Sequence, residues 1–322
     1  MKPLSVIGLL GPTGVGKTAL AIELARQLDT MIVSCDSMQV YAGFPVLTNQ
    51  PLAGEEGSGR HELVGFREPG ESFSAAEYAD LARPLIKREL ASCGCALVAG
   101  GSGLYMRAAL APLATPRPGD PDRRRWLEER ACGEGAYALH AELARIDVEA
   151  ARSIDPRNVR RVIRALEGVL SSGRAWSGRG DLWAPAYYHP TMVVALVMER
   201  GLLGRRIEAR AARMVQEGAI DEVRRFRLER GEELTRPGGR GICSAIGYTE
   251  ICRYLDGEQG LAETVEQITA ATRRYARRQL TWLRKIKGAV MIDVQDGQVK
   301  PIARRILRLA TRGEPAKEHC DP

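Results

Sequence analysis

The sequence contains no long apolar segment. Its longest apolar runs, such as Met192 to Met198, fall well short of the roughly 20 residues that a membrane-spanning helix needs. The first residues lead directly into a glycine-rich motif, without the charged and apolar regions of a secretory signal. We therefore expect a cytoplasmic protein without a membrane partner.

Metal-binding patterns are also scarce. The seven cysteines include no pair at the two-residue spacing of a zinc site, and the four histidines do not cluster with them. We expect neither structural zinc nor a disulfide framework. With 322 residues, 44% of them hydrophobic, the chain is long enough for one large or two ordinary domains with a sizeable core.

Positive charge is distributed unevenly along the chain. The net charge is +7, and eleven Lys or Arg residues fall between residues 272 and 308, against Asp293 and Asp296. Residues 157–164 contain a second basic cluster of four arginines. Such stripes are typical of a polyanion-binding surface, but equally of helix faces that only meet solvent.

Strand-like and helical segments alternate over the first hundred residues. Strands are predicted at residues 4–10, 31–34 and 96–99, and helices at residues 19–28 and 75–91. Residues 42–74 are rich in Gly, Pro and Glu and are predicted to form a long loop. This alternation predicts an α/β fold with a parallel sheet flanked by helices.

The pattern changes after a proline-rich segment at residues 115–121. Residues 122–172 are predicted to form helices only, and a β-type run returns at 192–198. We therefore expect a core domain of residues 1–114 and 187–322, interrupted by an all-helical insertion domain at residues 115–186.

The end of the chain is predicted to be mostly helical from residue 202 through the basic stretch at 272–287. A pair of short strands is expected at residues 289–301, before a basic, frayed tail.

The most specific motif has the pattern Gly-x-x-x-x-Gly-Lys-Thr between a predicted strand and a predicted helix, which is a P-loop in its required context. Its backbone N–H groups and the helix N-terminus attract phosphate, the lysine adds a cation, and the threonine hydroxyl suits Mg²⁺. The motif therefore predicts a phosphate or diphosphate site. Its residues are Gly11, Pro12, Thr13, Gly14, Val15, Gly16, Lys17 and Thr18.

The Mg²⁺-binding carboxylate of a typical P-loop NTPase is missing from the next candidate strand. That strand, at residues 96–99, is followed by Gly-Gly-Ser-Gly. The carboxylate that follows a strand close to the motif is Asp36. This favours a protein that holds a diphosphate without necessarily hydrolysing ATP, although Asp36 alone could equally be a helix N-cap.

Six segments together resemble the tRNA dimethylallyltransferase family, also called the IPP transferase family, in its bacterial type. They occur in family order across residues 11–282. The segments are the P-loop, Ser34 to Tyr41, Val98 to Tyr105, Arg161 to Glu167, Arg206 to Arg210 with Met214, Glu222 and Val223, and Ile246 to Glu250 with Thr272 to Trp282.

The resemblance implies a P-loop NTPase-like fold and a Mg²⁺-dependent prenyl transfer. The dimethylallyl group of dimethylallyl diphosphate would move to N6 of adenosine 37, in the anticodon stem-loop of tRNAs that read codons beginning with U. The P-loop would hold the diphosphate, with Thr18 on Mg²⁺. Asp36 would be the general base, and Arg210 would stabilise the leaving diphosphate. The enzyme is expected to act as a monomer.

The resemblance also implies a set of tRNA contacts, which come from four parts of the chain. They are Asp36, Ser37, Met38, Gln39, Ser102, Arg160, Arg161, Val162, Ile163, Arg164, Ser244, Ala245, Ile246, Gly247, Tyr248, Thr249, Arg277 and Arg278.

The sequence departs from the family pattern in two places. Thr48-Asn49-Gln50 lacks the glycine and lysine that are usual there, and a pair of histidines is reduced to His61. These changes put substrate affinity in question rather than the type of reaction.

Three other functions remain open at this stage. An adenylate isopentenyltransferase would prenylate free AMP, ADP or ATP, and it would not need the basic segments. A small-molecule P-loop kinase would need the missing carboxylate. In an RNA-binding protein that uses the P-loop as a nucleotide sensor, Asp36 would be dispensable.

Overall fold

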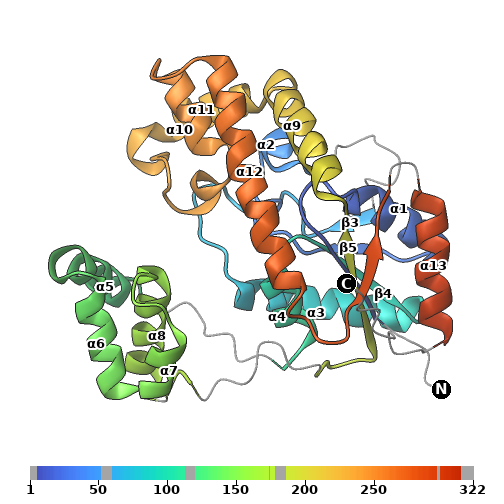
Figure 1. Cartoon of the computed structure of the whole chain (residues 1–322), viewed down its shortest axis with the longest axis horizontal. Helices are drawn as coiled ribbons and strands as arrows, with labels where there is room; N and C mark the ends of the chain where they lie inside the picture. Colours follow the sequence, from blue (N-terminus) through green and yellow to red (C-terminus); the bar gives the residue numbers. More distant parts are fainter. Residues whose placement is uncertain are drawn as a thin grey trace. The chain divides into compact units, whose positions relative to one another are not determined.

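The computed structural model describes residues 6–51, 60–112, 120–173, 175–177, 186–295 and 298–312. The chain divides into two compact units, which are described separately below. The first contains Met1–Ala111 and Pro185–Pro322, and the second contains Pro112–Ala184. Figure 1 shows the helices of the second unit, α5 to α8, in green.

The first unit is built on a six-stranded sheet, which confirms the expected α/β fold. Its strand order is β3-β2-β4-β1-β5-β6, and every neighbouring pair is parallel. The strands are β1 (Val6–Leu10), β2 (Ile32–Ser34), β3 (His61–Glu62), β4 (Ala96–Gly100), β5 (Thr191–Val197) and β6 (Val290–Asp293).

Helices cover both faces of this sheet. The helices of the first unit are α1 (Lys17–Leu28), α2 (Pro45–Thr48), α3 (Ala75–Ser92), α4 (Gly103–Leu110), α9 (Arg200–Gln216), α10 (Ala219–Leu234), α11 (Tyr248–Leu255), α12 (Leu261–Leu283) and α13 (Val299–Arg312), with a 3₁₀ turn at Gly241–Ser244.

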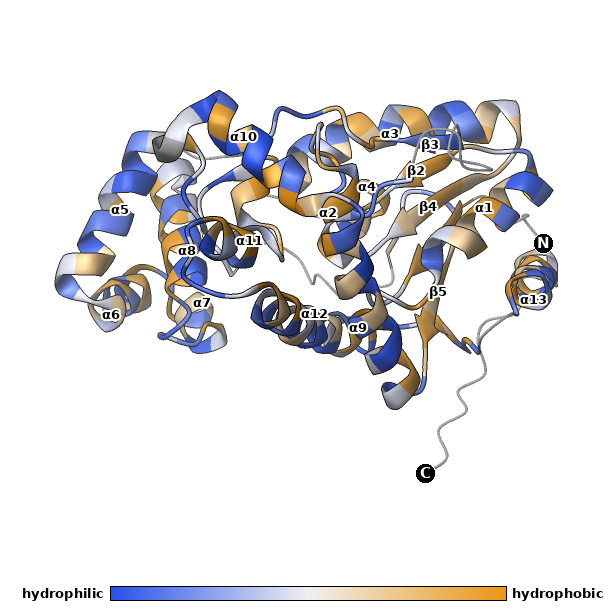
Figure 2. Cartoon of the chain, turned by 90° about the horizontal axis from the view of Figure 1, so that it is seen from above, coloured by the Kyte–Doolittle hydropathy of each residue, from blue (hydrophilic) through white to orange (hydrophobic). Residues whose placement is uncertain are grey.

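The alternation of side chains along β1 explains the layers. Ile7 and Leu9 join a buried cluster with α1 and α13, whereas Gly8 faces the other way. On that side a Cβ on Gly8 would lie 2.8 Å from Met106 Sδ of α4. Successive residues of a strand point to opposite faces, so both faces of β1 are buried. Figure 2 shows the apolar strands between the helices.

Because all the strands are parallel, the loops that follow β1, β2 and β4 lie together at the carboxyl ends of the strands. The P-loop follows β1, Asp36 follows β2, and the segment Gly100–Gly103 follows β4. In an open parallel sheet, ligands bind at the carboxyl ends of the strands. The fold therefore gathers the motif residues where a ligand can reach them.

The second unit is helical throughout its described residues. It contains α5 (Pro121–Glu134), α6 (Ala136–Ile146), α7 (Val148–Ser153) and α8 (Val159–Ser172). Its core includes Leu127, Leu139, Leu143 and Leu166, which are fully buried. The Asn158 side chain accepts the Arg161 N–H and starts α8.

Three predictions about secondary structure were wrong. The described part of segment 42–74 contains α2 and β3 as well as loop. The described residues between 289 and 301 contain one strand, β6, which pairs with β5 across the sheet, and the start of α13, instead of a pair of strands. The following residues form α13 rather than a frayed tail, since Ile302, Ala303 and Ile306 recur at helical spacing and pack with α1 in the core.

The basic segment predicted as helix at 272–287 is also shorter than expected. Helix α12 ends at Leu283, and its C-cap is Arg284. The last residues of the tail, 313–322, lie outside the described residues.

The tight packing of Gly100 provides a test of the fold. A Cβ on Gly100 would lie 1.9 Å from the carbonyl oxygen of Cys35. We expect Gly100→Ala to lower the free energy of unfolding by about 1–3 kcal/mol through backbone displacement. Gly204→Ala, inside helix α9 where the nearest atom is 3.9 Å away, is the control and should stabilise by about 0.5–1 kcal/mol. Denaturant unfolding of both variants measures the difference, and equal stabilities would contradict this packing.

Candidate active site

The P-loop has the backbone conformation that its glycines permit. Gly14 and Gly16 have φ angles of 86° and 96°, in the left-handed region that favours glycine. Gly11 is needed for a different reason, because a Cβ there would lie 2.8 Å from Val15 Cγ1. The Lys17 ammonium group donates to the carbonyl oxygens of Gly11 and Pro12, both at 2.9 Å. The loop thus encloses its own cation.

Burial disfavours the charged form of Lys17. Burial lowers the pKa of Lys17 from its usual value to about 8; Asp36 opposes this shift, and Arg210 adds to it. Burial also lowers the pKa of Arg210. An anion bound between these groups would stabilise both charged forms, so their arrangement suits a phosphate or diphosphate.

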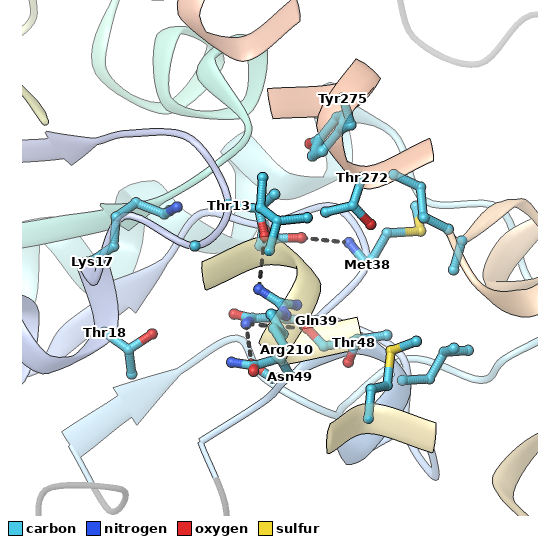
Figure 3. A pocket seen from close by; sticks show the side chains of 18 of the residues that line it. Thr13, Lys17, Thr18, Met38, Gln39, Thr48, Asn49, Arg210, Thr272 and Tyr275 are labelled. Atoms are coloured by element: carbon cyan, nitrogen blue, oxygen red, sulfur yellow. Dashed lines mark hydrogen bonds between the residues drawn. The ribbon is translucent and has the colours of Figure 1, made fainter. Parts of the chain in front are cut away.

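Arg210 reaches the P-loop from helix α9. Its Nη1 donates to Thr13 Oγ1 at 2.7 Å (Figure 3). The Arg206 side chain, one turn earlier on the same helix, also lines the cavity. Helix α9 therefore adds two guanidinium groups to the cation of the loop.

Asp36 lies in the same cavity wall and is not a helix N-cap. Its Oδ1 accepts the Met38 N–H at 2.9 Å, in a turn that fixes the carboxylate. Within the described residues, no hydrogen bond is made by Oδ2. The neighbouring Ser37 N–H donates to Ser102 Oγ at 3.1 Å, which joins the loop after β2 to the loop after β4.

Helix α12, whose residues 272–282 belong to the segments that carry the family resemblance, also contributes to the cavity. Thr272, Tyr275 and Gln279 recur along one face and line the cavity. Gln279 Oε1 accepts the Thr13 N–H at 2.9 Å, and its Nε2 donates to Gly101 O at 2.9 Å. The helical spacing of these residues was the available signal, but it gives no indication that an amide meets a loop 266 residues away.

These groups surround one cavity of about 580 Å³. Figure 3 shows Lys17, Thr18 and Arg210 around it, with Thr272 and Tyr275 from α12. Its wall also has an apolar part, formed by Leu47, Ala211, Met214, Ile246 and Ile268. The cavity thus combines a cationic region with an apolar region and a carboxylate.

Parts of the two regions that depart from the family pattern line the same cavity. Thr48 and Asn49 of the first region, and His61 of the second, are in its wall with Gln39. Gln39 Nε2 donates to the carbonyl oxygen of Asn49 at 2.6 Å. Backbone atoms therefore supply part of this wall, whatever the side chain at position 49.

The predicted RNA contacts of the insertion helix need a correction. The side chains of Val162 and Ile163 are 0% and 5% exposed and lie in the core of the second unit, so they are not available to RNA. Arg160 and Arg161 are exposed on the same helix. Arg164 donates to Glu167 at 2.8 Å. Only the polar face of α8 can serve the predicted role.

The predicted segment at 244–249 also divides in two. Ser244, Ala245 and Ile246 line the cavity. Tyr248 is 0% exposed, and its hydroxyl donates to Thr235 O at 2.8 Å, so it is a core residue rather than a contact. Gly247 begins α11 with a φ of 99°.

Arg277 and Arg278 lie outside the core, as a role in binding requires. Both are exposed on α12 and border a hollow of about 250 Å³ together with Thr281, Trp282 and Lys285. Arg278 also lines the large cavity. Its guanidinium lies 5.7 Å from the centre of the Tyr275 ring.

The donors in the cavity fit a hard cation with few protein ligands. Within the described residues no group of three or more His, Cys, Asp or Glu side chains could hold a metal. Thr18 supplies a hydroxyl at the start of α1. Mg²⁺ is commonly held by one or two protein oxygens together with substrate phosphates, and this donor set suits that mode.

No helix in the described part of the chain is long and apolar enough to cross a membrane.

Comparison with known proteins identifies the family. The sequence model of the IPP transferase family matches residues 39–286. The chain belongs to the IPP transferase family. The resemblance inferred from the motifs is therefore confirmed, and with it the assignment of the chain as a transferase enzyme.

Individual members are similar over nearly the whole chain. A tRNA dimethylallyltransferase of Thermomicrobium roseum is 40% identical over 309 residues, which cover 95% of this chain and 92% of that protein. The crystal structure of a tRNA isopentenylpyrophosphate transferase from Bacillus halodurans is 36% identical, has a TM-score of 0.67, and covers 96% of this chain and 97% of its own.

A eukaryotic dimethylallyltransferase, solved in a study of its action on tRNA, shares the fold. Its TM-score is 0.82 at 22% identity, over 99% of this chain and 82% of that chain.

The lowered pKa of Lys17 predicts how anion binding depends on pH. The ammonium group loses its proton as the pH rises through about 8, and the anion then loses one cationic partner. We expect the affinity for inorganic pyrophosphate to fall about tenfold from pH 7 to pH 9, as the protonated fraction does. Calorimetric titration measures it. The Lys17→Met variant, which binds more weakly, corrects for titration of the ligand, and an equal fall in both proteins would contradict the assignment.

Proposed function

We propose that this chain is a tRNA dimethylallyltransferase that transfers the dimethylallyl group of dimethylallyl diphosphate to N6 of an adenosine in tRNA. The observation that carries the proposal is that the P-loop, Asp36 and an apolar wall open into one cavity. A prenyl diphosphate has an anionic part and an apolar part, and the acceptor amine needs a base. Membership of the IPP transferase family supports the same activity.

The cationic part of the cavity would stabilise the leaving diphosphate. As the bond from the allylic carbon to oxygen breaks, its electron pair leaves with the diphosphate, and negative charge develops there. P-loop residues, among them Gly14, Gly16 and Lys17, line this region together with Arg210. Donors that are fixed before the reaction need little reorganisation, which is how such sites lower a barrier.

Thr18 is the side chain that would hold Mg²⁺, together with oxygens of the bound diphosphate. The ion would neutralise part of the charge that develops on the diphosphate. The donor set described above supports this role.

Asp36 would receive the proton of the acceptor amine. The lone pair of an exocyclic adenine amine is delocalised into the ring, so the amine is a weak nucleophile until a base takes its proton. The Asp36 Oδ1 atom is engaged by Met38, which orients the carboxylate and leaves Oδ2 to act. A positioned base contributes roughly 10²–10⁴-fold to the rate.

The apolar wall of the cavity suits the dimethylallyl group of the donor. Leu47, Met214 and Ile268 would pack around the five-carbon dimethylallyl group, while the diphosphate lies at the P-loop. Apolar burial of this kind fixes the allylic carbon at a defined distance from the amine.

RNA is the acceptor that the surface favours over free AMP. Beside the cavity lies the basic hollow of Arg277, Arg278 and Lys285 with the ring of Trp282. Cations and an aromatic ring together are typical of single-stranded RNA binding. The exposed Arg160 and Arg161 of the second unit support the same acceptor. Position 37 of tRNAs that read codons beginning with U is the target we propose, on the family resemblance.

A kinase is disfavoured by the end of β4. A Cβ at Gly100 or Gly103 would lie 1.9 Å from neighbouring atoms, so a carboxylate cannot stand there. Glu199 follows β5, but its carboxylate accepts the N–H groups of Gly201 and Leu202 at the start of α9.

A transfer assay separates these functions. Radiolabelled dimethylallyl diphosphate is offered with unmodified tRNA and with AMP in the same reaction. We expect label in tRNA alone. Label in AMP would identify an adenylate isopentenyltransferase, and the absence of label from both acceptors would contradict a dimethylallyltransferase.

Removing the carboxylate of Asp36 tests the base. Asp36→Ala and Asp36→Asn should each lower turnover by at least two orders of magnitude and leave tRNA affinity nearly unchanged. Asp36→Asn retains an acceptor for the Met38 N–H, so it separates loss of the base from loss of the turn. Rapid-quench kinetics and a binding titration measure the two effects. Undiminished turnover in either variant would remove Asp36 from the mechanism and favour a nucleotide sensor.

Arg278→Ala tests the RNA surface. Loss of one phosphate contact should weaken tRNA binding and reduce the slope of log affinity against log salt by about 1. Arg26→Ala is the matched control, since Arg26 lies in the last turn of α1, away from the cavity, and pairs with Glu23. An unaltered slope for Arg278→Ala would place this side chain away from the phosphates.

A further inference from the structure

One face of helix α12 docks onto the loop that follows β4. Tyr275, Gln279 and Trp282 are spaced by four and three residues, which places them on the same side of the helix. The Tyr275 hydroxyl interacts with the Ser102 side chain. A Cβ on Gly103 would lie 1.9 Å from the Trp282 ring. The middle residue of this face, Gln279, does more than pack.

The Gln279 amide connects two loops of the active site. It is 7% exposed, and both of its ends are engaged by backbone groups. Its oxygen accepts the Thr13 N–H, and its nitrogen donates to the carbonyl oxygen of Gly101, each at 2.9 Å. Reversing the amide would place donor against donor and acceptor against acceptor, so the two contacts fix its orientation.

The connection continues to the guanidinium that faces the diphosphate region. Thr13 gives its N–H to Gln279 and accepts from Arg210 Nη1 through its hydroxyl, at 2.7 Å. A hydrogen-bonded chain therefore runs from Gly101 through Gln279 and Thr13 to Arg210. The Gly101 end of this chain lies beside the proposed base, because a Cβ on Gly101 would be 3.3 Å from Asp36 Oδ2.

The P-loop needs an external support of this kind. Its glycines give the backbone many conformations when no anion is bound, and restricting them costs free energy. Lys17 bonds to the loop's own carbonyls at Gly11 and Pro12, which does not fix the loop relative to α9 and α12. Arg206 and Arg210 reach the loop from α9, and Gln279 reaches its backbone from α12.

We propose that Gln279 is a positioning residue that holds Thr13, and through it Arg210, in the geometry that binds a diphosphate. The proposal rests on the proposed function only for its effect on turnover. Its effect on anion binding is separate from the identity of the acceptor.

The test is a double-mutant cycle on binding of inorganic pyrophosphate with Mg²⁺. Gln279→Leu removes both amide contacts, and Thr13→Val removes the hydroxyl that Arg210 meets while keeping the Thr13 N–H. If Gln279 acts through Thr13, each variant loses about tenfold in pyrophosphate affinity, and the double variant loses no more than about threefold beyond the weaker single variant. Gln267→Leu makes the same change on α12 at a side chain that bonds only Glu263, and it should bind as the wild type does.

Two results would overturn the proposal. The first is wild-type pyrophosphate affinity in Gln279→Leu. The second is losses that multiply in the double variant, which would indicate a separate, structural effect of Gln279. If Gln279→Leu unfolds at nearly the same temperature as Gln267→Leu and binds tRNA with nearly the same affinity, general misfolding is excluded. Transfer turnover should fall with pyrophosphate affinity, and a wild-type protein that transfers no label would refute the proposed function without affecting the binding result.

Discussion

The site depends on a loop that has no room for a side chain at two of its positions. After β4, the positions of Gly100 and Gly103 each leave less than 2 Å for a Cβ, against the Cys35 carbonyl and the Trp282 ring. This closeness lets the end of β2, the end of β4 and helix α12 meet. Asp36 and Gln279 reach the cavity because they stand on either side of this loop.

The cavity holds two cationic side chains that are removed from water. Lys17 and Arg210 have lowered pKa values because they are removed from water, and Asp36 compensates only in part. A group that is costly to keep charged in the empty cavity gains most when an anion arrives. Binding of a diphosphate and stabilisation of its developing charge therefore draw on the same groups. The cavity also has apolar wall residues such as Leu47, Met214 and Ile268, which on our proposal would meet the carbon skeleton of the donor.

The sequence predicted the parts of the site that depend on local spacing. The P-loop was evident because its eight residues are contiguous, and the parallel sheet followed from alternating strands and helices. Asp36 was assigned by family resemblance, since an aspartate after a strand is by itself ambiguous. The cavity now contains it, which is consistent with that assignment, and its role as base stays a prediction.

Contacts across long separations could not be predicted in this way. Gln279 is an uncharged residue that meets a loop 266 positions away, and although it lies in a segment that carries the family resemblance, the sequence assigned no role to it. Val162 and Ile163 were included because a whole segment was carried over from the family. The helical period of α8 shows that they face its core. The strand pair at 289–301 was wrong for a related reason, since β6 finds its partner in β5, almost a hundred residues earlier in the chain.

The most direct test of the account is to identify the product. Unmodified tRNA is incubated with the protein and dimethylallyl diphosphate, digested to nucleosides, and analysed by chromatography and mass spectrometry against authentic N6-(dimethylallyl)adenosine. The account predicts this nucleoside as the one new product, at a single adenosine beside the anticodon. A prenyl group on another atom or another base, or unchanged tRNA after a reaction that consumes the donor, would contradict it.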